Sequence, residues 1–514
     1  MKPLRETIQS WKQDHLLKRV VRNSSYLFGS NMVSSVLSFI QTVIAVRLIG
    51  VTSWGLVATI QTFASNINRF LSFRMSEVVV KHLAPSLADD KKQEAAVLVK
   101  AAGLTEAATS VVAFLILVLL APWASKVFAQ DATTVPLFVF YGLILLSNLV
   151  FETSTGVLQA THRFDHLALV NLVNSIITFV VIGGTYILYR WGGVITTSHL
   201  LEIILLAYVL AKTYVGVAQA VLALRELKHI LGPGWWQVPL KTLPGKRSLI
   251  MFALNTNLNG TVNLFFRDNI PLYMANLLST TAVGYFKIAM TLTLPITLIL
   301  DPFIAPTYTE ISRTIAKFQW KATLRLLKRI TAITGGVVLA IWTAWALVGR
   351  WIIPILYKPQ ALPVYPLLLI LIAGYGFASV FQWNRSLFLS YGKPGYPVLI
   401  SMLVGIIEVA LIYSLVPRYG YLMMAAILSG YFILSIGFIN LRGLWEVRRR
   451  ALLEPQLPTE DSSQISPPDA QPDELRQAAR PAKARSTFQS AMTTPGVNRW
   501  DWAAVLTFLA FAVM

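Results

Sequence analysis

The stretch that decides the fold is SLIMFALNTNLNGTVNLFFRDNIPLYMANLL, residues 248–278. It is long enough to cross a membrane as a helix, yet it carries Asn255, Asn259, Asn263 and Arg267 at every fourth position. Residues four apart lie on one face of an α-helix. Amide and guanidinium groups within a bilayer face protein or a water-filled cavity, because an arginine at the helix centre costs about 2.5 to 3.5 kcal/mol. The stretch predicts one wall of a polar pathway through a membrane protein; the alternative is an interhelical hydrogen-bond seam without a ligand.

The composition agrees with a helical membrane protein. Of 514 residues, 55% are hydrophobic and 13% are charged, against about 25% charged in soluble domains. Apolar runs of membrane-spanning length recur along the chain, and none has the alternating pattern of a transmembrane barrel. The chain contains no cysteine, which excludes disulfides, thiolate chemistry and cysteine metal sites.

The formal charge of +20 is distributed by side of the membrane. When the apolar runs are laid out as twelve spans, most basic residues fall in alternate loops, and this positive-inside bias places the amino terminus and the central loop in the cytoplasm. The charge therefore reports topology, and nucleic acid is not expected as a partner. No secretory signal peptide is visible, since residues 1–22 are charged and form at most an interfacial helix.

We expect an all-α polytopic membrane protein with two six-helix lobes related by a pseudo-two-fold axis along the membrane normal. The expected segments are a cytoplasmic amphipathic amino terminus (1–22), the first lobe (23–222), a cytoplasmic inter-lobe loop (223–247) and the second lobe (248–441). The spans of the first lobe are expected near 24–48, 54–82, 97–121, 135–158, 167–188 and 200–222. Those of the second are expected near 248–276, 283–307, 330–352, 364–388, 397–415 and 421–441.

The composition changes after the last span. Residues 442–499 are basic and then rich in proline, serine and glutamine, which is typical of a disordered linker. Residues 500–514 are apolar but shorter than the roughly 20 residues of a full span. They are interpreted either as a truncated thirteenth span or as an interfacial tail.

The two halves resemble each other at a nearly constant offset. Thr52–Gly55 and Thr281–Gly284 each open a span and are 229 positions apart. Three further matches have offsets of 228 to 231: Val135 with Val364, Leu158 with Leu389, and residues 190–192 with 418–420. With an even number of spans in each half, the copies have the same orientation, and parallel repeats of this kind are a feature of transporters.

Several motifs carry a family resemblance. They are RLIG at 47–50 with WG at 54–55, GVLQATHRFD at 156–165, DNIP through AVGY at 268–285, the stretch 383–393, and RYG at 418–420. Through them the chain resembles the oligosaccharide flippases of the polysaccharide transporter family, in the multidrug/oligosaccharidyl-lipid/polysaccharide exporter superfamily, over about residues 20 to 450. Two features depart from the family. LSFRMSE at 71–77 replaces a small, glycine-containing segment, and many relatives have fourteen spans.

The resemblance implies a flippase that translocates polyprenyl-diphosphate-linked oligosaccharide across the bacterial inner membrane by alternating access, for surface polysaccharide biosynthesis. The implied partners are the lipid-linked oligosaccharide, membrane lipids, and a polysaccharide polymerase or glycosyltransferases, with no cofactor. Two alternatives stay open. One is a cation-coupled multidrug exporter of the same fold, and the other is a non-transporting scaffold for polysaccharide synthesis.

Charges inside the expected spans mark the candidate site. Deep cations suit an anionic headgroup, because guanidinium and ammonium groups bind phosphate oxygens. The candidate substrate-binding residues are Arg69, Arg74, Lys212, Arg267, Lys287, Asn255, Asn259 and Asn263, and the candidate ion-coupling carboxylates are Glu106, Asp301 and Glu408. The alternative is structural pairing, of Arg267 with Asp268 and of Arg74 with Glu77.

The sequence offers no support for an enzyme or a metal site. The motifs GxSxG and HExxH are absent, and the PGKRS stretch at 244–248 lacks the first glycine of a phosphate loop, since residue 240 is leucine. His162 and His166 lie beside Asp165 without a convincing further ligand. We therefore expect a non-enzymatic protein without a metal.

Overall fold

The computed structural model describes residues 15–72, 74–192, 199–240, 264–391, 393 and 395–453. Every regular element in these ranges is a helix. Contacts divide the chain into two units, residues 1–454 and 455–514, and all described residues belong to the first. The expected proline-rich linker from residue 455 onward and the apolar residues 500–514 lie outside the described residues, as do Asn255, Asn259 and Asn263.

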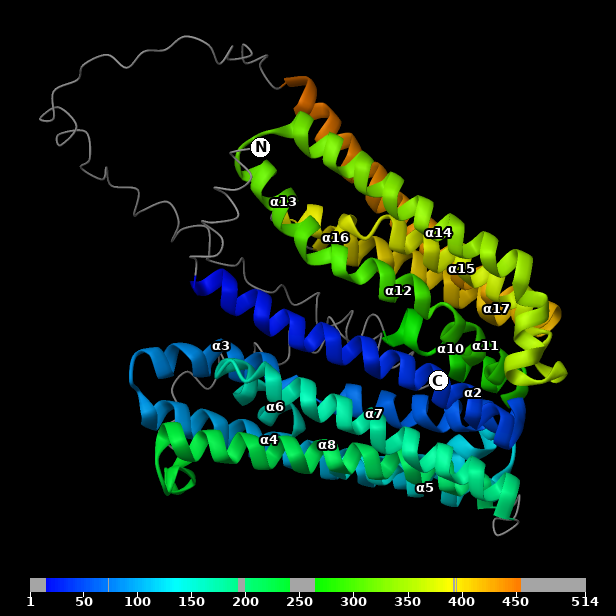
Figure 1. The fold of residues 1–514 in the computed structure, drawn as a ribbon, viewed down its shortest axis with the longest axis horizontal. Helices are drawn as coiled ribbons and strands as arrows, with labels where there is room; N and C mark the ends of the chain where they lie inside the picture. Colours follow the sequence, from blue (N-terminus) through cyan, green and yellow to red (C-terminus); the bar gives the residue numbers. More distant parts are fainter. Residues whose placement is uncertain are drawn as a thin grey trace, which may run out of the picture. The chain divides into compact units, whose positions relative to one another are not determined.

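Residues 15–240 form the first bundle. Its α-helices are α2 (His15–Leu71), α3 (Met75–Ala88), α4 (Lys92–Ala124), α5 (Val135–Gly142), α6 (Phe151–Ala160), α7 (Phe164–Ile187) and α8 (Leu200–Leu231). Its short helical turns are η1 (Ser125–Ala129), η2 (Ala132–Thr134), η3 (Leu143–Asn148), η4 (Leu188–Gly192) and η6 (Trp235–Gln237). Helix α2 lies alongside α7 (Figure 1). A buried apolar core joins α3 to α4, α6 and α8 through residues such as Leu83, Val99, Leu158 and Leu227.

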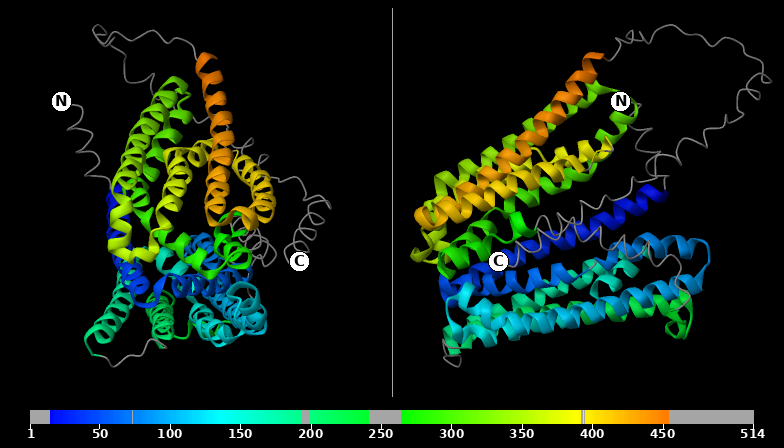
Figure 2. Two further views of the ribbon diagram at one scale, coloured as in Figure 1. Left: turned by 90° about the vertical axis from the view of Figure 1, so that its right-hand side faces the viewer. Right: turned by 180° about the vertical axis from the view of Figure 1, so that it is seen from behind.

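Residues 264–453 form the second bundle. Its elements are η8 (Leu264–Asp268), α10 (Ile270–Leu277), α11 (Thr280–Leu292), α12 (Leu294–Leu300), η9 (Asp301–Phe303), α13 (Ile304–Ala316), α14 (Trp320–Tyr357), η10 (Pro359–Ala361), α15 (Val364–Val380), α16 (Trp383–Ser390) and α17 (Gly395–Leu453). Helices α14, α15 and α17 lie side by side (Figures 1 and 2). A second apolar core around Trp383 connects α13, α14, α16 and α17.

The apolar helices confirm a multi-pass membrane protein. In the part of the chain that the structure describes, nine stretches are long and apolar enough to cross a membrane. Two of them are each bent into two helical segments, at Gly50 with a φ of 80° and at Gly420 with a φ of 73°, a conformation that glycine adopts without steric cost. Counted this way, the stretches coincide with eleven of the twelve expected spans. The remaining one, 248–276, falls largely on residues outside the described ranges.

Two helices continue beyond their expected ends. Helix α8 runs to Leu231, whereas a loop was predicted from residue 223, and α17 runs to Leu453, whereas a linker was predicted from residue 442. In α17 the extension is held by side-chain pairs at helical spacing. Arg450 Nη2 lies 2.7 Å from the Glu446 carboxylate, four residues earlier, which is the spacing that favours such pairs on a helix.

Two expected spans of the first bundle are interrupted. The span at 54–82 is broken between the end of α2 at Leu71 and the start of α3 at Met75, and Arg74, just before α3, has a positive φ of 45°. The span at 135–158 passes through the 3-10 turn η3 and breaks again before α6 begins at Phe151. Non-helical backbone at membrane depth is tolerated only where it is buried in protein or lines a water-filled cavity, so both breaks point to the interior of this bundle.

The second bundle is interrupted at matching places. The 3-10 turn η9 at Asp301–Phe303 is 229 positions after the break at 72–74. Helix α15 ends at Val380, and α16 begins at Trp383, 232 positions after Phe151, at which α6 begins. The two helix breaks of the second bundle therefore lie at offsets of 229 and 232 from those of the first, close to the offsets of the sequence repeat.

The two bundles touch through main-chain atoms where α2 crosses α11. A Cβ atom added to Gly55 would lie 1.7 Å from the carbonyl oxygen of Thr280, and one added to Gly284 would lie 2.2 Å from a main-chain oxygen of α2. Only glycine permits this approach. Beside it, the hydroxyl oxygens of Thr52 and Thr281 are 2.8 Å apart. The segments that are 229 positions apart in the sequence are thus in contact with each other.

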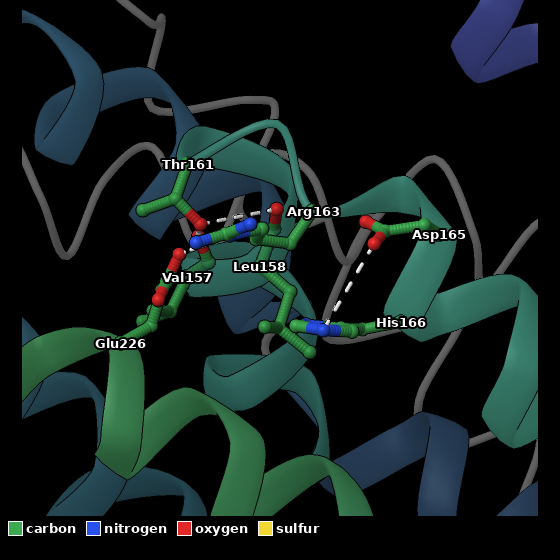
Figure 3. A network of polar contacts seen from close by, with 7 residues as sticks. All are labelled: Val157, Leu158, Thr161, Arg163, Asp165, His166 and Glu226. Carbon is green, nitrogen blue, oxygen red and sulfur yellow. Dashed lines mark hydrogen bonds and ion pairs between the residues drawn. The ribbon is translucent and has the colours of Figure 1, made fainter.

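The turn between α6 and α7 carries the end of the GVLQATHRFD motif (Figure 3). Arg163 donates from Nε to Glu226 of α8, and this hydrogen bond, followed by the charge of Glu226, raises the pKa of Arg163 above its ordinary value. Thr161 Oγ1 donates to the carbonyl oxygen of Val157 at 2.9 Å. The motif therefore shapes this turn and fastens it to α8. No group of three or more His, Cys, Asp or Glu residues within the described ranges could hold a metal ion.

Candidate functional site

A cavity of about 230 Å³ lies inside the first bundle. Leu71 and Ser72 line it, so the break between α2 and α3 reaches its wall. Its polar lining consists of Gln61, Ser65, Asn68, Ser72, Glu106, Thr109, Ser110, Tyr141, Asn148, Glu152 and Lys212. Polar groups inside a membrane face protein or a water-filled cavity, and this cavity provides such surroundings for the amides, hydroxyls and ionisable groups that line it.

Glu106 of α4 stabilises the helix break before α6, at the wall of this cavity. Its carboxylate accepts hydrogen bonds from the main-chain N–H groups of Glu152 and Thr153, at 2.6 and 2.8 Å. These N–H groups belong to the first turn of α6, where helical donors have no partner within their own helix, and a negative charge is favourable at a helix amino terminus. The Glu106 residue is only 5% exposed. It therefore caps α6 from a neighbouring helix.

Lys212 of α8 completes the charged part of the cavity. Its Nζ lies 3.6 Å from the centroid of the Phe151 ring, a cation–π contact. Glu106 and Glu152 are both close enough to act electrostatically on the ammonium group. Ser76 of α3 donates a hydrogen bond to the Glu152 carboxylate. The ionisable lining thus holds two acids and one base, for a formal charge of −1.

The positions that match these charges in the second bundle are uncharged. At the offset of 229 from Glu106 stands Gly335, and at the offset of 228 from Lys212 stands Asn440. Thr334, next to Gly335, donates from Oγ1 to the carbonyl oxygen of Val380 at 3.1 Å, at the break that ends α15. A neutral hydroxyl therefore stabilises this break, where the first bundle uses a carboxylate.

A second polar site lies at the contact between the bundles, around Asp268. Arg69 of α2 forms an ion pair with Asp268 at the end of η8. The side chains of this pair are 51% and 35% exposed. Asp268 also acts electrostatically on Lys287 of α11. Next to the pair, Asn66 Nδ2 donates to the side-chain oxygen of Asn269.

Arg267 adds a third cation beside Asp268. Its guanidinium carbon lies 5.7 Å from the ring centroid of Phe432 and 6.0 Å from that of Tyr375, so aromatic faces hold it. Tyr375 interacts electrostatically with both Arg267 and Asp268. We call Arg69, Arg267 and Lys287 around Asp268 the cation cluster. Among the predicted substrate-binding residues, these three lie on segments that meet at the contact between the bundles, and Lys212 lines the separate cavity.

The other predicted site residues are dispersed. Arg74 pairs with Glu77 at 2.9 Å, the structural alternative foreseen for it. Asp301 is exposed on η9. Glu408 of α17 is 2% exposed, and neither of its carboxylate oxygens has a hydrogen-bond partner among the described residues. Glu106 lies in the first-bundle cavity, so the three candidate coupling carboxylates do not share one site.

Part of the cavity wall was not among the predicted site residues. Gln61, Ser65, Asn68 and Ser72 all line it, and their spacing of four, three and four residues is that of a single helix face. This stripe, which runs along α2 to Ser72 just beyond its end, was visible in the sequence. Glu152 was missed because it was placed near the end of an unbroken span, whereas the break before α6 brings it into the cavity.

Comparison with known proteins identifies relatives over more than half of the chain. A family model described as polysaccharide biosynthesis protein matches residues 20–305. The inner membrane protein YghQ of Escherichia coli (strain K12) is 27% identical over 161 residues. This match covers 31% of the present chain and 45% of YghQ, so the matched region spans less than half the length of that relative.

Solved structures share the fold. An inward-facing multidrug resistance MATE family transporter of the MOP superfamily is 12% identical, with 81% of this chain and 95% of that chain covered and a TM-score of 0.63. The lipid II flippase MurJ, in an inward closed conformation, is 14% identical, with 83% and 91% covered and a TM-score of 0.58. An outward-facing MATE family transporter is 12% identical, with 85% and 96% covered and a TM-score of 0.54. The similarity to these structures shows the fold that the chain shares with them.

Proposed function

Since the chain belongs to the polysaccharide biosynthesis protein family, we propose that it is a flippase for polyprenyl-diphosphate-linked oligosaccharide, acting by alternating access in the bacterial inner membrane. The observation that supports this most is the ion pair between Arg69 and Asp268 at the contact between the bundles, with Arg267 next to Asp268 in the chain and Lys287 within electrostatic reach of it. Three cations and one acid leave a formal charge of +2. A diphosphate is a ligand of matching charge, and guanidinium groups bind its oxygens in pairs.

The substrate is divided between the two polar sites in this proposal. The cation cluster holds the diphosphate, and the amides and hydroxyls of the first-bundle cavity meet sugar hydroxyls. Helix α2 is common to both, since Asn68 lines the cavity while Arg69 pairs across the bundle contact. Asn255, Asn259 and Asn263 remain predicted sugar contacts. The polyprenyl tail stays in the bilayer.

Direction follows from topology and charge. We place the amino terminus and the inter-lobe loop in the cytoplasm, where the lipid-linked oligosaccharide is loaded, and the product is passed to a polymerase or to glycosyltransferases outside. Outward movement of an anion is favoured by an inside-negative potential, by about 2.3 kcal/mol per charge per 100 mV. The diphosphate therefore supplies part of the driving force for its own transfer.

The test is a reconstituted flipping assay. Purified protein is placed in liposomes containing a fluorescent polyprenyl-diphosphate oligosaccharide, and dithionite quenches only the outer leaflet. Protein-dependent loss of the protected fluorescence is expected, and Arg69→Gln should slow it about tenfold or more, because a hydrogen bond to a charged group contributes about 1.5 to 3 kcal/mol. Arg190→Gln is the control, since Arg190 is exposed on η4 at the end of a span. Quenching no faster than in protein-free liposomes would refute the proposal.

A cation-coupled multidrug exporter is the second candidate, and the acid-rich cavity is the observation that favours it. Two carboxylates, Glu106 and Glu152, lie there with a single cation, Lys212, and carboxylates inside a membrane are typical of proton and ion pathways. The same liposomes distinguish the candidates. Uptake of a cationic dye driven by an imposed proton or sodium gradient, without transfer of the lipid-linked sugar, would identify the exporter.

A further inference from the structure

The Asp268 carboxylate occupies the place on Arg69 that a substrate phosphate would take. It is the acid of the cation cluster, it is paired with Arg69, and both side chains are partly open to solvent, at 35% and 51% exposure. Carboxylate and phosphate oxygens engage a guanidinium group through the same forked geometry. A diphosphate that reaches Arg69 must therefore compete with Asp268 for the same donors.

The pair also joins the two bundles. Arg69 belongs to α2 of the first bundle, and Asp268 ends η8 of the second. Asn66 and Asn269, the residues beside them, form a second link between the same segments. An external anion that replaces Asp268 on Arg69 would break an ion pair between the bundles. The guanidinium N–H groups of Arg69 therefore serve either the contact between the bundles or a bound anion.

We propose that Asp268 is a displaceable counter-ion: a substrate diphosphate takes its place on Arg69 and thereby releases the link between α2 and η8. This inference rests on the proposed function and adds a coupling step to it. A ligand shifts a conformational equilibrium only by its differential affinity for the two states. Here the affinity for diphosphate differs between the two states, because all N–H donors of Arg69 are available to the diphosphate only when the ion pair with Asp268 is open.

The first test measures binding of inorganic diphosphate to the full chain in nanodiscs, by titration calorimetry. Asp268→Asn removes the competitor and keeps the shape of the side chain. It should tighten binding about tenfold, whereas Asp268→Glu, which keeps the competing charge, should bind as the native chain does. Equal or weaker binding by Asp268→Asn would overturn the inference. Sulfate is the control for a general response to anions.

The second test follows the link itself in chains that keep Asp268. Because the chain has no cysteine, Asn66→Cys with Asn269→Cys offers one pair of thiols to a short bifunctional reagent. Inorganic diphosphate should slow their cross-linking several-fold, and the same pair combined with Asp268→Asn should show no such dependence. Cross-linking that is insensitive to diphosphate in the presence of Asp268 would overturn the inference.

A third experiment distinguishes a lipid-linked diphosphate from free diphosphate as the ligand. It also distinguishes failure of the displacement of Asp268 from failure of the proposed function. Nanodiscs loaded with a polyprenyl diphosphate should slow the cross-linking at a lower ligand concentration than inorganic diphosphate, if the lipid is the natural source. Should neither ligand bind to any of the variants, the proposed function fails together with the inference. Should both bind and flipping occur while Asp268→Asn binds no more tightly, only the displacement of Asp268 is refuted.

Discussion

Removal of the Glu106 carboxylate should loosen α6 specifically. Glu106→Ala would leave two buried main-chain donors, the N–H groups of Glu152 and Thr153, without the acceptors that now lie at 2.6 and 2.8 Å. Each buried unsatisfied donor costs about 1 to 3 kcal/mol, which gives about 2 to 6 kcal/mol for the pair. Water that enters the cavity would bring the loss toward the lower end.

Glu106→Gln should be less damaging, because the amide oxygen can still accept one of the two bonds. We expect a loss of about 1.5 to 3 kcal/mol, the net contribution of the one hydrogen bond to a charged acceptor that is lost. Thermal melting of the purified protein and hydrogen exchange at the amides of residues 151–160 measure both variants. Glu202→Gln is the matched control, since Glu202 is exposed and paired with His199. Unchanged exchange in α6 for Glu106→Ala, or a larger effect of Gln than of Ala, would refute the reasoning.

The remaining predictions concern the bundle crossing, the cavity and the turn before α7. Gly55→Ala should lower the melting temperature and the flipping rate, because its Cβ meets a main-chain oxygen, whereas Gly183→Ala, with no atom within 4 Å of the added Cβ, should be neutral; equal effects would contradict this. Lys212→Met should destabilise the protein by leaving two carboxylates without their cation, and adding Glu152→Gln should recover most of the loss in a double-mutant cycle; a double variant no more stable than Lys212→Met would show that the charges do not interact. Glu226→Gln should lower the unfolding free energy by under about 1 kcal/mol, the usual contribution of a partly exposed ion pair, and a larger loss in melting experiments would show that the turn depends on it more strongly.

Apolar run length predicted most of the helices, because the bilayer sets a minimum length for each span. The bends at Gly50 and Gly420 fall between expected spans for the same reason. The break between α2 and α3 was not predicted, because the apolar residues on either side of it were read as one span. The sequence there is polar: LSFRMSE at 71–77 contains Arg74 and Glu77. The spacing of Gln61, Ser65, Asn68 and Ser72 likewise pointed to a polar surface.

The pairing of charges could be predicted only where it is local. Arg74 and Glu77 are three residues apart on one helix face, and their ion pair follows from that spacing. Arg69 and Asp268 are 199 positions apart, and nothing in either local sequence specifies the partner. The local alternative for Asp268 was its neighbour Arg267, which instead lies against the rings of the second bundle. Which cation pairs with Asp268 depends on how the two bundles pack against each other, and this packing cannot be read from the residues near Asp268 in the sequence.

The contact between α2 and α11 at Gly55 and Gly284 is made by main-chain atoms. Main-chain atoms are the same in every residue, so the contact does not depend on neighbouring side chains. Under the proposed function, substitutions in the cavity and the cation cluster can change which glycan or headgroup is bound, while this main-chain contact between the bundles keeps its geometry. Substrate specificity and the packing of the two bundles would then evolve separately, with the two glycines kept unchanged.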